Sequence, residues 1–343
     1  MGKLIMWIVL LIVGFILLVK GADWFVDGAA GIAEKCKIPA LVIGLTVVAF
    51  GTSAPELAVS VTSAIKHSTD IAIGNVVGSN IVNILLILGL AALFHALPVQ
   101  KSSLRLDLPV LVLASGLLVL LGALGGALQW WDGLILLGVF AVYMTLLLHG
   151  AIKEQKTLLK EVPQGTLEEQ SEEKAEQPTG GKIAVWYAGM KKHVWFLIVL
   201  TLIGLAMVVG GGTLLVDGAQ YIAEYFGVPQ RVIGLTVVAI GTSLPELVTS
   251  VVAAKKGETD IAVGNVIGSN LFNILLVAGT SSLFYPLTFS ISGNLVDALV
   301  ALAAVLLLLI LALIGKKQLG KVAGAIMLAS FVGYYVYLFL ATL

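Results

Sequence analysis

The sequence of 343 residues contains little cysteine, histidine or charge. Its one cysteine, Cys36, excludes a disulfide within the chain, and with four scattered histidines a metal site of thiolates and imidazoles is not expected. Charged residues make up 12% of the chain and the net charge is zero, so no overall field attracts a nucleic acid. Neither an H-E-x-x-H zinc motif nor a nucleophile elbow occurs. We therefore expect no enzyme activity, no cofactor and no nucleic-acid partner.

Apolar residues are abundant instead, at 59% of the chain, and the mean hydropathy is +1.05. Soluble domains are usually about a quarter charged, so this composition favours a membrane protein. A helix that crosses a bilayer needs about 17 to 25 mainly apolar residues. Ten such runs can be marked, at 4–19, 40–65, 71–94, 107–125, 131–150, 194–216, 230–254, 261–284, 295–315 and 321–342. We predict an all-α polytopic membrane protein with ten transmembrane helices.

One segment, at 151–193, differs from the rest in composition. It mixes Lys, Glu, Gln, Pro and Gly with few large apolar residues, which is typical of a flexible tether. This predicts three parts: a first five-helix repeat at 1–150, a flexible cytoplasmic linker at 151–193 and a second five-helix repeat at 194–343.

The distribution of Lys and Arg predicts the orientation. With ten helices and both termini outside, seventeen of the twenty basic residues fall on the cytoplasmic side, the side of the linker. The outer side keeps three, Lys3, Lys66 and Arg231. Because cytoplasmic loops carry the excess of basic residues, we expect a multi-pass protein of the cell membrane in this orientation.

Two stretches of the chain are copies of each other. Residues 42–83 align without gaps to residues 232–273, and 29 of the 42 positions are identical. Shared apolar composition would not reproduce Pro, Glu, Asn and Thr in register, so this is a duplication. Five predicted helices separate the copies, an odd number, so the halves are expected to be inverted relative to each other. Inverted repeats with a site between them near the membrane midplane are a transporter architecture.

Each copy carries a polar motif inside an apolar run, GTSAPE at 51–56 and GTSLPE at 241–246. A carboxylate at this depth costs several kcal/mol (order of magnitude), which makes Glu56 and Glu246 candidates for function. Pro55 and Pro245 lack a backbone N–H, so each breaks the helical hydrogen bonding of its run. The freed carbonyls must meet protein, water or an ion.

The donors of both copies are all hard oxygen atoms. The side chains are carboxylates, hydroxyls and amides, on Thr52, Ser53, Glu56, Ser79, Asn83, Thr242, Ser243, Glu246, Ser269 and Asn273, and Ala49 and Ala239 contribute carbonyls. Such oxygens suit Ca²⁺, which takes about six to eight of them, and they suit Na⁺ as well. Two carboxylates neutralise one Ca²⁺. The two asparagines could equally hold helices together.

At these residues the sequence resembles the prokaryotic sodium/calcium exchangers of the cation/calcium exchanger superfamily. The likeness lies in GTSAPE with GNVVGSNIVN and GTSLPE with GNVIGSNLFN, and in the ten helices and central loop. It implies an antiporter that exchanges Ca²⁺ for Na⁺ by alternating access. The resemblance also implies that Glu56 and Glu246 bind Ca²⁺ directly, and that the hydroxyls and the Ala49 and Ala239 carbonyls line the ion sites. No oligomer is required.

One departure from that pattern concerns the coupling ion. Some relatives, the potassium-dependent members among them, have Asp at the position of Asn273, whereas both copies have Asn here, at 83 and 273. This argues against a potassium requirement. The GTS-x-PE motif favours Na⁺ coupling over the H⁺ coupling of another branch. A Ca²⁺/H⁺ antiporter and a cation channel are the alternative functions.

Overall fold

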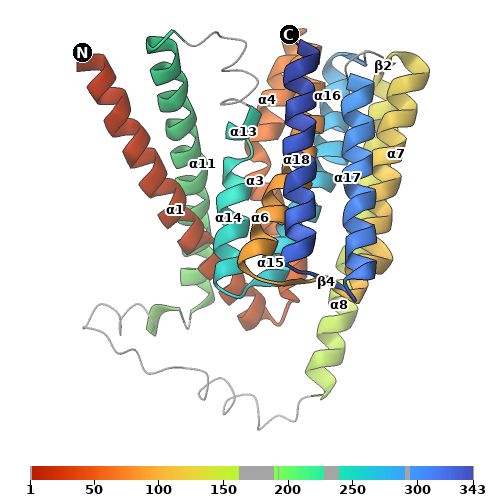
Figure 1. Cartoon of the computed structure of the whole chain (residues 1–343). Helices are drawn as coiled ribbons and strands as arrows, with labels where there is room; N and C mark the ends of the chain where they lie inside the picture. The colour runs from red at the N-terminus through yellow and green to blue at the C-terminus, as the bar shows by residue number, and fades with distance from the viewer. Residues whose placement is uncertain (1, 162–188, 192, 228–238, 290–293, 343) are drawn as a thin grey trace.

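The computed structural model describes residues 2–161, 189–191, 193–227, 239–289 and 294–342. Long helices run side by side, and the start of α1 and the end of α18 lie at the same end of the bundle (Figure 1). The C-terminal end of α8 lies at the opposite end. Short strands join loops of the two halves, and otherwise the described fold is helical.

The first half contains eight helices and three π-helical turns. The helices are α1 (Gly2–Cys36), α2 (Ala40–Ile43), α3 (Ala49–Thr52), α4 (Ala54–Ile65), α5 (Thr69–Ile81), α6 (Gly89–Phe94), α7 (Leu108–Gly125) and α8 (Trp130–Glu161). The π-helical turns are η1 (Gly44–Val48), η2 (Val82–Leu88) and η3 (Ser103–Asp107). Because η2 continues α5 into α6 and η3 leads into α7, these pieces form continuous spans.

The second half repeats this order. Its described helices are α11 (Val194–Tyr225), α13 (Ala239–Gly241), α14 (Leu244–Lys255), α15 (Thr259–Leu271), α16 (Gly279–Phe284), α17 (Asn294–Ile314) and α18 (Lys321–Thr342), with the π-helical turn η5 (Phe272–Ala278). Within the described ranges, eight helices are long and apolar enough to cross a membrane, or nine with the bent pair Ala40–Thr52 and Ala54–Ile65. The start of the predicted helix at 230–254 lies outside the described residues.

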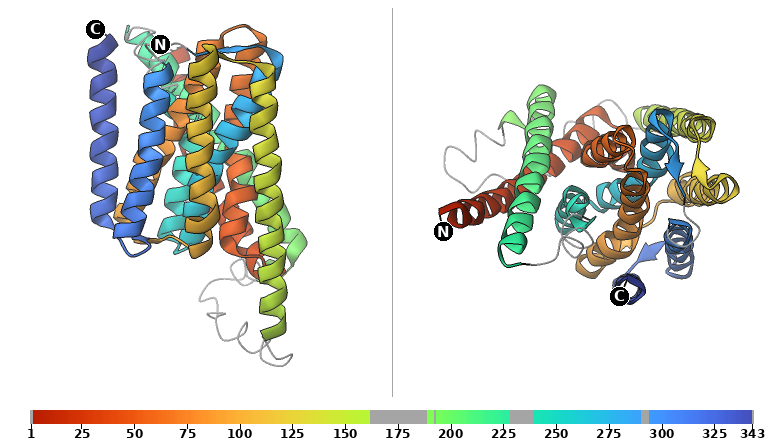
Figure 2. Two further views of the ribbon diagram at one scale, coloured as in Figure 1. Left: turned by 90° about the vertical axis from the view of Figure 1, so that its right-hand side faces the viewer. Right: turned by 90° about the horizontal axis from the view of Figure 1, so that it is seen from above.

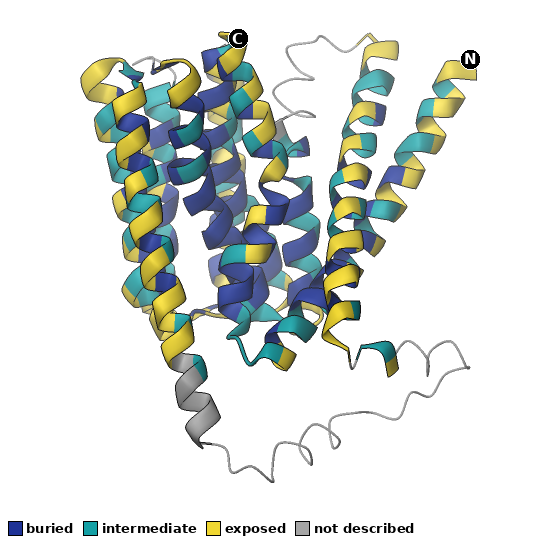
Figure 3. Ribbon diagram, turned by 180° about the vertical axis from the view of Figure 1, so that it is seen from behind, coloured by how far each residue is buried: buried dark blue, intermediate teal, exposed yellow. Residues whose placement is uncertain are grey.

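The middle span of each half is the buried one. In their most apolar windows, the spans Thr69–Phe94 and Thr259–Phe284 are 78% and 94% buried, against 11% for Gly2–Cys36. Figure 3 shows the same contrast between interior and outer helices. The outer helices expose large apolar side chains such as Ile8 and Ile12, as a lipid-facing surface requires. The all-helical polytopic membrane fold is therefore confirmed.

Helices α1 and α11 cross beside the rest of the bundle (Figure 2). Glycines spaced by seven residues allow their backbones to touch: Gly14 and Gly21 of α1 face Gly211 and Gly204 of α11 across the crossing. A Cβ at Gly204 would lie 2.5 Å from the nitrogen of Phe25. Small residues at such a seam are the usual way in which membrane helices pack closely.

Helix α1 is longer than the apolar run at 4–19 predicts and continues to Cys36. The extension carries Asp23 and Asp27, which form ion pairs with Lys256 at 2.6 and 2.5 Å. Lys191 also pairs with Asp27, at 2.6 Å. Hydropathy ends the helix early because it counts these aspartates as unpaired charges. Similarly, α8 continues to Glu161, so the first part of the segment at 151–193 is helical.

Two short antiparallel strand pairs join the halves. Strand β1 (Leu97–Pro98) pairs with β4 (Gln318–Leu319), and β2 (Ala127–Leu128) pairs with β3 (Leu287–Thr288). Strands β2 and β4 lie at opposite ends of the bundle in Figure 1. Each half therefore contributes one strand to each end.

Candidate functional site

The first GTS-x-PE motif lies at a break in a membrane-spanning helix. Helix α3 ends at Thr52, Ser53 has φ −85° and ψ 4°, and α4 starts at Ala54 with a bend of 46°. Pro55 stands in the first turn of α4, where its missing N–H costs least. It cannot donate to the Gly51 carbonyl, as the sequence predicts. The Ala49 carbonyl, in contrast, still accepts the Ser53 N–H at 2.9 Å, so only its second lone pair is available for an ion.

The second motif has the same break with one difference. Ser243 has φ −89° and ψ 6°, and α14 starts at Leu244 with Pro245 in its first turn. Here the Ser243 N–H donates to the carbonyl of Ile240 at 3.2 Å. The motif N–H thus reaches the Ala49 carbonyl in the first copy and the Ile240 carbonyl in the second.

Glu56 and Glu246 follow these breaks, and both are 0% exposed. Their carboxylates interact electrostatically with each other, so the fold brings the acidic pair together. Ser53 of the first half donates to Oε1 of Glu246 at 3.0 Å, and Ser269 also lies beside this carboxylate. Neither oxygen of Glu56 has a hydrogen-bond partner among the described residues.

The predicted asparagines lie where α5 and α15 continue into their π-helical turns. Asn83 donates its amide nitrogen to Asn270 Oδ1 at 3.4 Å, and Asn273 donates to Asn80 Oδ1 at 3.3 Å. The Oδ1 atoms of Asn83 and Asn273 are buried without a partner in the described structure. Both interpretations left open by the sequence are thus compatible: the nitrogens join helices, and the oxygens remain for an ion. Turns of π-helix frequently occur at functional sites.

Unpartnered buried oxygens gather at the residues that the sequence singled out. Across the described ranges, fourteen buried polar side-chain atoms lack a hydrogen-bond partner, and eight of them are oxygens of predicted site residues. They are both oxygens of Glu56, Oε2 of Glu246, the Oδ1 atoms of Asn83 and Asn273, and the hydroxyls of Ser79, Ser243 and Ser269. Buried polar groups are normally satisfied, so such a concentration indicates a missing partner. Oxygen atoms that include two carboxylates are suited to a hard cation.

The two predicted threonines differ from this group because both have protein partners. Thr52 is buried and lies 3.1 Å from Asn265 Oδ1. Thr242 is half-buried and donates to Asn75 Oδ1 at 3.4 Å. Sequence reasoning did not assign Asn75 and Asn265 a role. Their identity in both copies, inside GNVVG and GNVIG, was the available signal.

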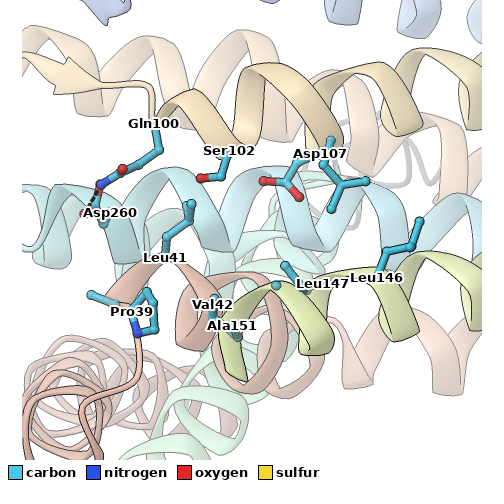
Figure 4. A pocket seen from close by; sticks show the side chains of 13 residues that line it. Pro39, Leu41, Val42, Gln100, Ser102, Asp107, Leu146, Leu147, Ala151 and Asp260 are labelled. Carbon is cyan, nitrogen blue, oxygen red and sulfur yellow. Dashed lines mark hydrogen bonds between the residues drawn. The ribbon is translucent and has the colours of Figure 1, made fainter. Parts of the chain in front are cut away.

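A cavity of about 320 Å³ lies elsewhere, between α2, α8 and the start of α15. Figure 4 shows Asp107 and Asp260 among the side chains that line it, with Gln100 donating to Asp260 at 2.8 Å. None of the predicted site residues lines this cavity. It is separate from the acidic pair.

The family profile described as "Sodium/calcium exchanger protein" matches residues 6–149 and 196–340, which include both motifs. The chain belongs to this exchanger family. Its members are transporters and not enzymes, and the family supports a Ca²⁺ exchanger of the antiporter type for this member.

Relatives of this exchanger family member match over nearly the whole chain. A putative antiporter, CaxA, of Alkalimonas amylolytica is 39% identical over 96% of this chain and 98% of its own. The sodium/calcium exchanger MaX1 of Methanosarcina acetivorans is 36% identical over 96% of this chain and 97% of its own. The fold is similar to that of the sodium-calcium exchanger NCX_Mj soaked with Na⁺ and Ca²⁺, with a TM-score of 0.78, 33% identity, and coverage of 97% of this chain and 98% of that one.

Proposed function

We propose that this protein is a secondary active antiporter that exchanges Ca²⁺ for Na⁺ by alternating access. The observation that carries the proposal is the group of unpartnered buried oxygens around Glu56 and Glu246. The family and the relative named a sodium/calcium exchanger support the choice of ions.

Electrostatics explains why such a site exchanges ions. Two carboxylates removed from water are costly unless a positive charge balances them, and one Ca²⁺ balances both. When Ca²⁺ leaves, Na⁺ ions or protons must take its place. A protein whose site cannot stay empty therefore couples the release of one ion to the binding of another. The ligands in this proposal are the two glutamates, the hydroxyls of Ser53, Ser79, Ser243, Ser269 and the two threonines, the oxygens of Asn83 and Asn273, and the Ala49 and Ala239 carbonyls.

The proposed architecture is ten helices in two inverted five-helix repeats, 1–150 and 194–343, joined by a cytoplasmic linker. The placement of the strand pairs supports it, since β1 and β3 occupy matching positions in the repeat and lie at opposite ends of the bundle. The termini at one end and the basic loops at the other support a cell-membrane protein with both termini outside. Inverted repeats allow the same site to open to either side in turn.

A Ca²⁺/H⁺ antiporter is the second candidate. It is favoured by Glu56, whose carboxylate has no cationic partner among the described residues and could be balanced by a proton. A cation channel is the third, because channels also use carboxylates and carbonyls.

The test is Ca²⁺ uptake into proteoliposomes that contain the purified protein. We expect uptake with an outward Na⁺ gradient, and little with an outward H⁺ gradient in the absence of Na⁺. Uptake with the H⁺ gradient alone would replace the first candidate with the second. Equal Ca²⁺ release from loaded vesicles with and without either counter-ion would identify a channel and contradict both antiporter proposals.

A further inference from the structure

Two asparagines, Asn75 on α5 and Asn265 on α15, make the same contacts in the two halves. The Nδ2 of Asn75 donates to the hydroxyl of Ser60 at 2.9 Å and to the carbonyl of Glu56 at 3.2 Å. In the second half, Asn265 Nδ2 lies 2.8 Å from the Ser250 hydroxyl and 3.5 Å from the carbonyl of Glu246. Each asparagine is thus held by its own half, directly behind the acidic residue.

The amide oxygens point across to the other half. Asn265 Oδ1 lies 3.1 Å from the hydroxyl of Thr52, and Asn75 Oδ1 accepts from Thr242 at 3.4 Å. A primary amide has two N–H groups, and both face acceptors in its own half. The oxygen of each amide is therefore fixed toward the threonine of the opposite half. We call these two contacts the asparagine braces.

A threonine hydroxyl has one proton, and Thr52 has three acceptors for it. Besides Asn265, they are the carbonyls of Val48 at 3.1 Å and Ala49 at 3.4 Å. When the hydroxyl donates to Asn265, the second lone pair of the Ala49 carbonyl and the lone pairs of the hydroxyl remain available to a cation. When the hydroxyl donates to Ala49 instead, that lone pair of a proposed ligand is occupied. The brace thus decides how many oxygen ligands the first half offers.

The two braces differ in this structure. Asn265 and Thr52 are both 0% exposed. Asn75 and Thr242 are half-buried, and their contact is the longer one. The Asn265 brace is therefore buried, while the residues of the Asn75 brace are partly exposed.

We propose that Asn265 is a positioning residue of the ion site: it accepts the hydrogen bond of the Thr52 hydroxyl and so frees the Ala49 carbonyl for the transported cation. Asn75 orients the Thr242 hydroxyl of the other half through the matching contact. This rests on the proposed antiport function and adds to it a control on affinity that lies outside the ligands themselves. We expect Asn265 to have the larger effect on Ca²⁺ affinity, because its brace is buried and the shorter of the two.

The test is a double-mutant cycle on Asn265→Leu and Thr52→Val, with half-saturating Ca²⁺ for Na⁺-driven uptake as the readout. Losing one hydrogen-bond acceptor corresponds to about 3- to 10-fold in affinity, so Asn265→Leu should raise half-saturating Ca²⁺ by about that factor. With Val at 52 there is no hydroxyl proton to divert, so adding Asn265→Leu should change the value by less than about twofold. Effects of the two substitutions that multiply, or an unchanged value in Asn265→Leu, would overturn the proposal.

Two further measurements separate this proposal from loss of folding and from failure of the antiport function. Ser250→Ala removes the 2.8 Å support of the Asn265 amide without touching the ion site, and should raise half-saturating Ca²⁺ in the same direction by a smaller factor. That effect should also disappear with Val at 52, and its persistence would count against the brace. If the wild-type protein shows no Na⁺-driven uptake, the proposed function fails; the same cycle is then read from the Ca²⁺-induced shift in melting temperature, where additivity again refutes the brace.

Discussion

The substitution Glu56→Gln is expected to weaken Ca²⁺ binding and to stabilise the ion-free protein at the same time. Both oxygens of Glu56 are buried without a hydrogen-bond partner in the described part of the chain, and its carboxylate faces that of Glu246. An amide of the same shape removes the repulsion between the two groups. A residue that served only to hold the fold together would give the opposite sign for stability.

The magnitudes follow from burial of the pair. Removing one partner of a buried charge interaction costs about 3–5 kcal/mol, which corresponds to about 100- to 5,000-fold weaker Ca²⁺ binding. Loss of the repulsion between the two buried carboxylates should stabilise the ion-free protein, seen as a rise of a few degrees in melting temperature. Bound Ca²⁺ at 100 times its Kd stabilises the wild type by about 2.7 kcal/mol, and this increment should be absent in the variant.

The assay is thermal unfolding in detergent, without ions and over a Ca²⁺ titration, combined with uptake into proteoliposomes. Asp107→Asn is the matched control, because Asp107 is a buried carboxylate outside the site whose Oδ1 accepts from Tyr143 at 3.1 Å. An asparagine can still accept that bond, so we expect little change in Ca²⁺ affinity. The reasoning is refuted if Glu56→Gln keeps wild-type Ca²⁺ affinity, or if it lowers the ion-free melting temperature.

Other parts of the molecule give three more predictions. Gly204→Leu would place a Cβ 2.5 Å from the backbone of α1, so it should lower the free energy of unfolding by about 1–3 kcal/mol. At the control position Gly210 a Cβ meets no described atom within 4 Å, so Gly210→Leu should be neutral. Equal effects of the two substitutions would contradict the close helix crossing. Burial and neighbouring carboxylates raise the pKa of Glu258 above its ordinary 4.5, so wild-type stability should fall as pH rises above that value. Glu258→Gln should therefore raise the melting temperature at about pH 7 and not at about pH 4, and a pH-independent difference would refute the cause. Tyr334→Phe removes the 2.9 Å hydrogen bond to Asp297 and should lower stability by about 1–3 kcal/mol, while an unchanged melting temperature would show that the carboxylate is satisfied without it.

Much of the site could be predicted because its determinants are local. Pro55 and Pro245 break their helices whatever surrounds them, since a missing N–H is a property of the residue itself. The burial of Glu56 and Glu246 follows from apolar runs on both sides. For the same reason the membrane fold could be predicted from composition and run length, and the exchanger family from the duplicated motif.

Other features could not be predicted because they depend on partners distant in sequence. Helix α1 continues past its apolar run, and there its Asp23 and Asp27 are paired with Lys256 and Lys191 from elsewhere in the chain. Hydropathy averages neighbours along the chain and cannot count such pairs.

The sequence by itself determined that the chain carries the same polar motif twice, each on a broken membrane helix. Only the tertiary structure decided that the copies differ: Ser53 donates to Glu246, while the hydroxyl of Ser243 has no partner among the described residues. Identical local sequences produce identical local breaks, but a contact between the halves depends on where one half lies against the other. That placement is set by packing over the whole bundle, and it gives each half of a repeated sequence its own set of partners.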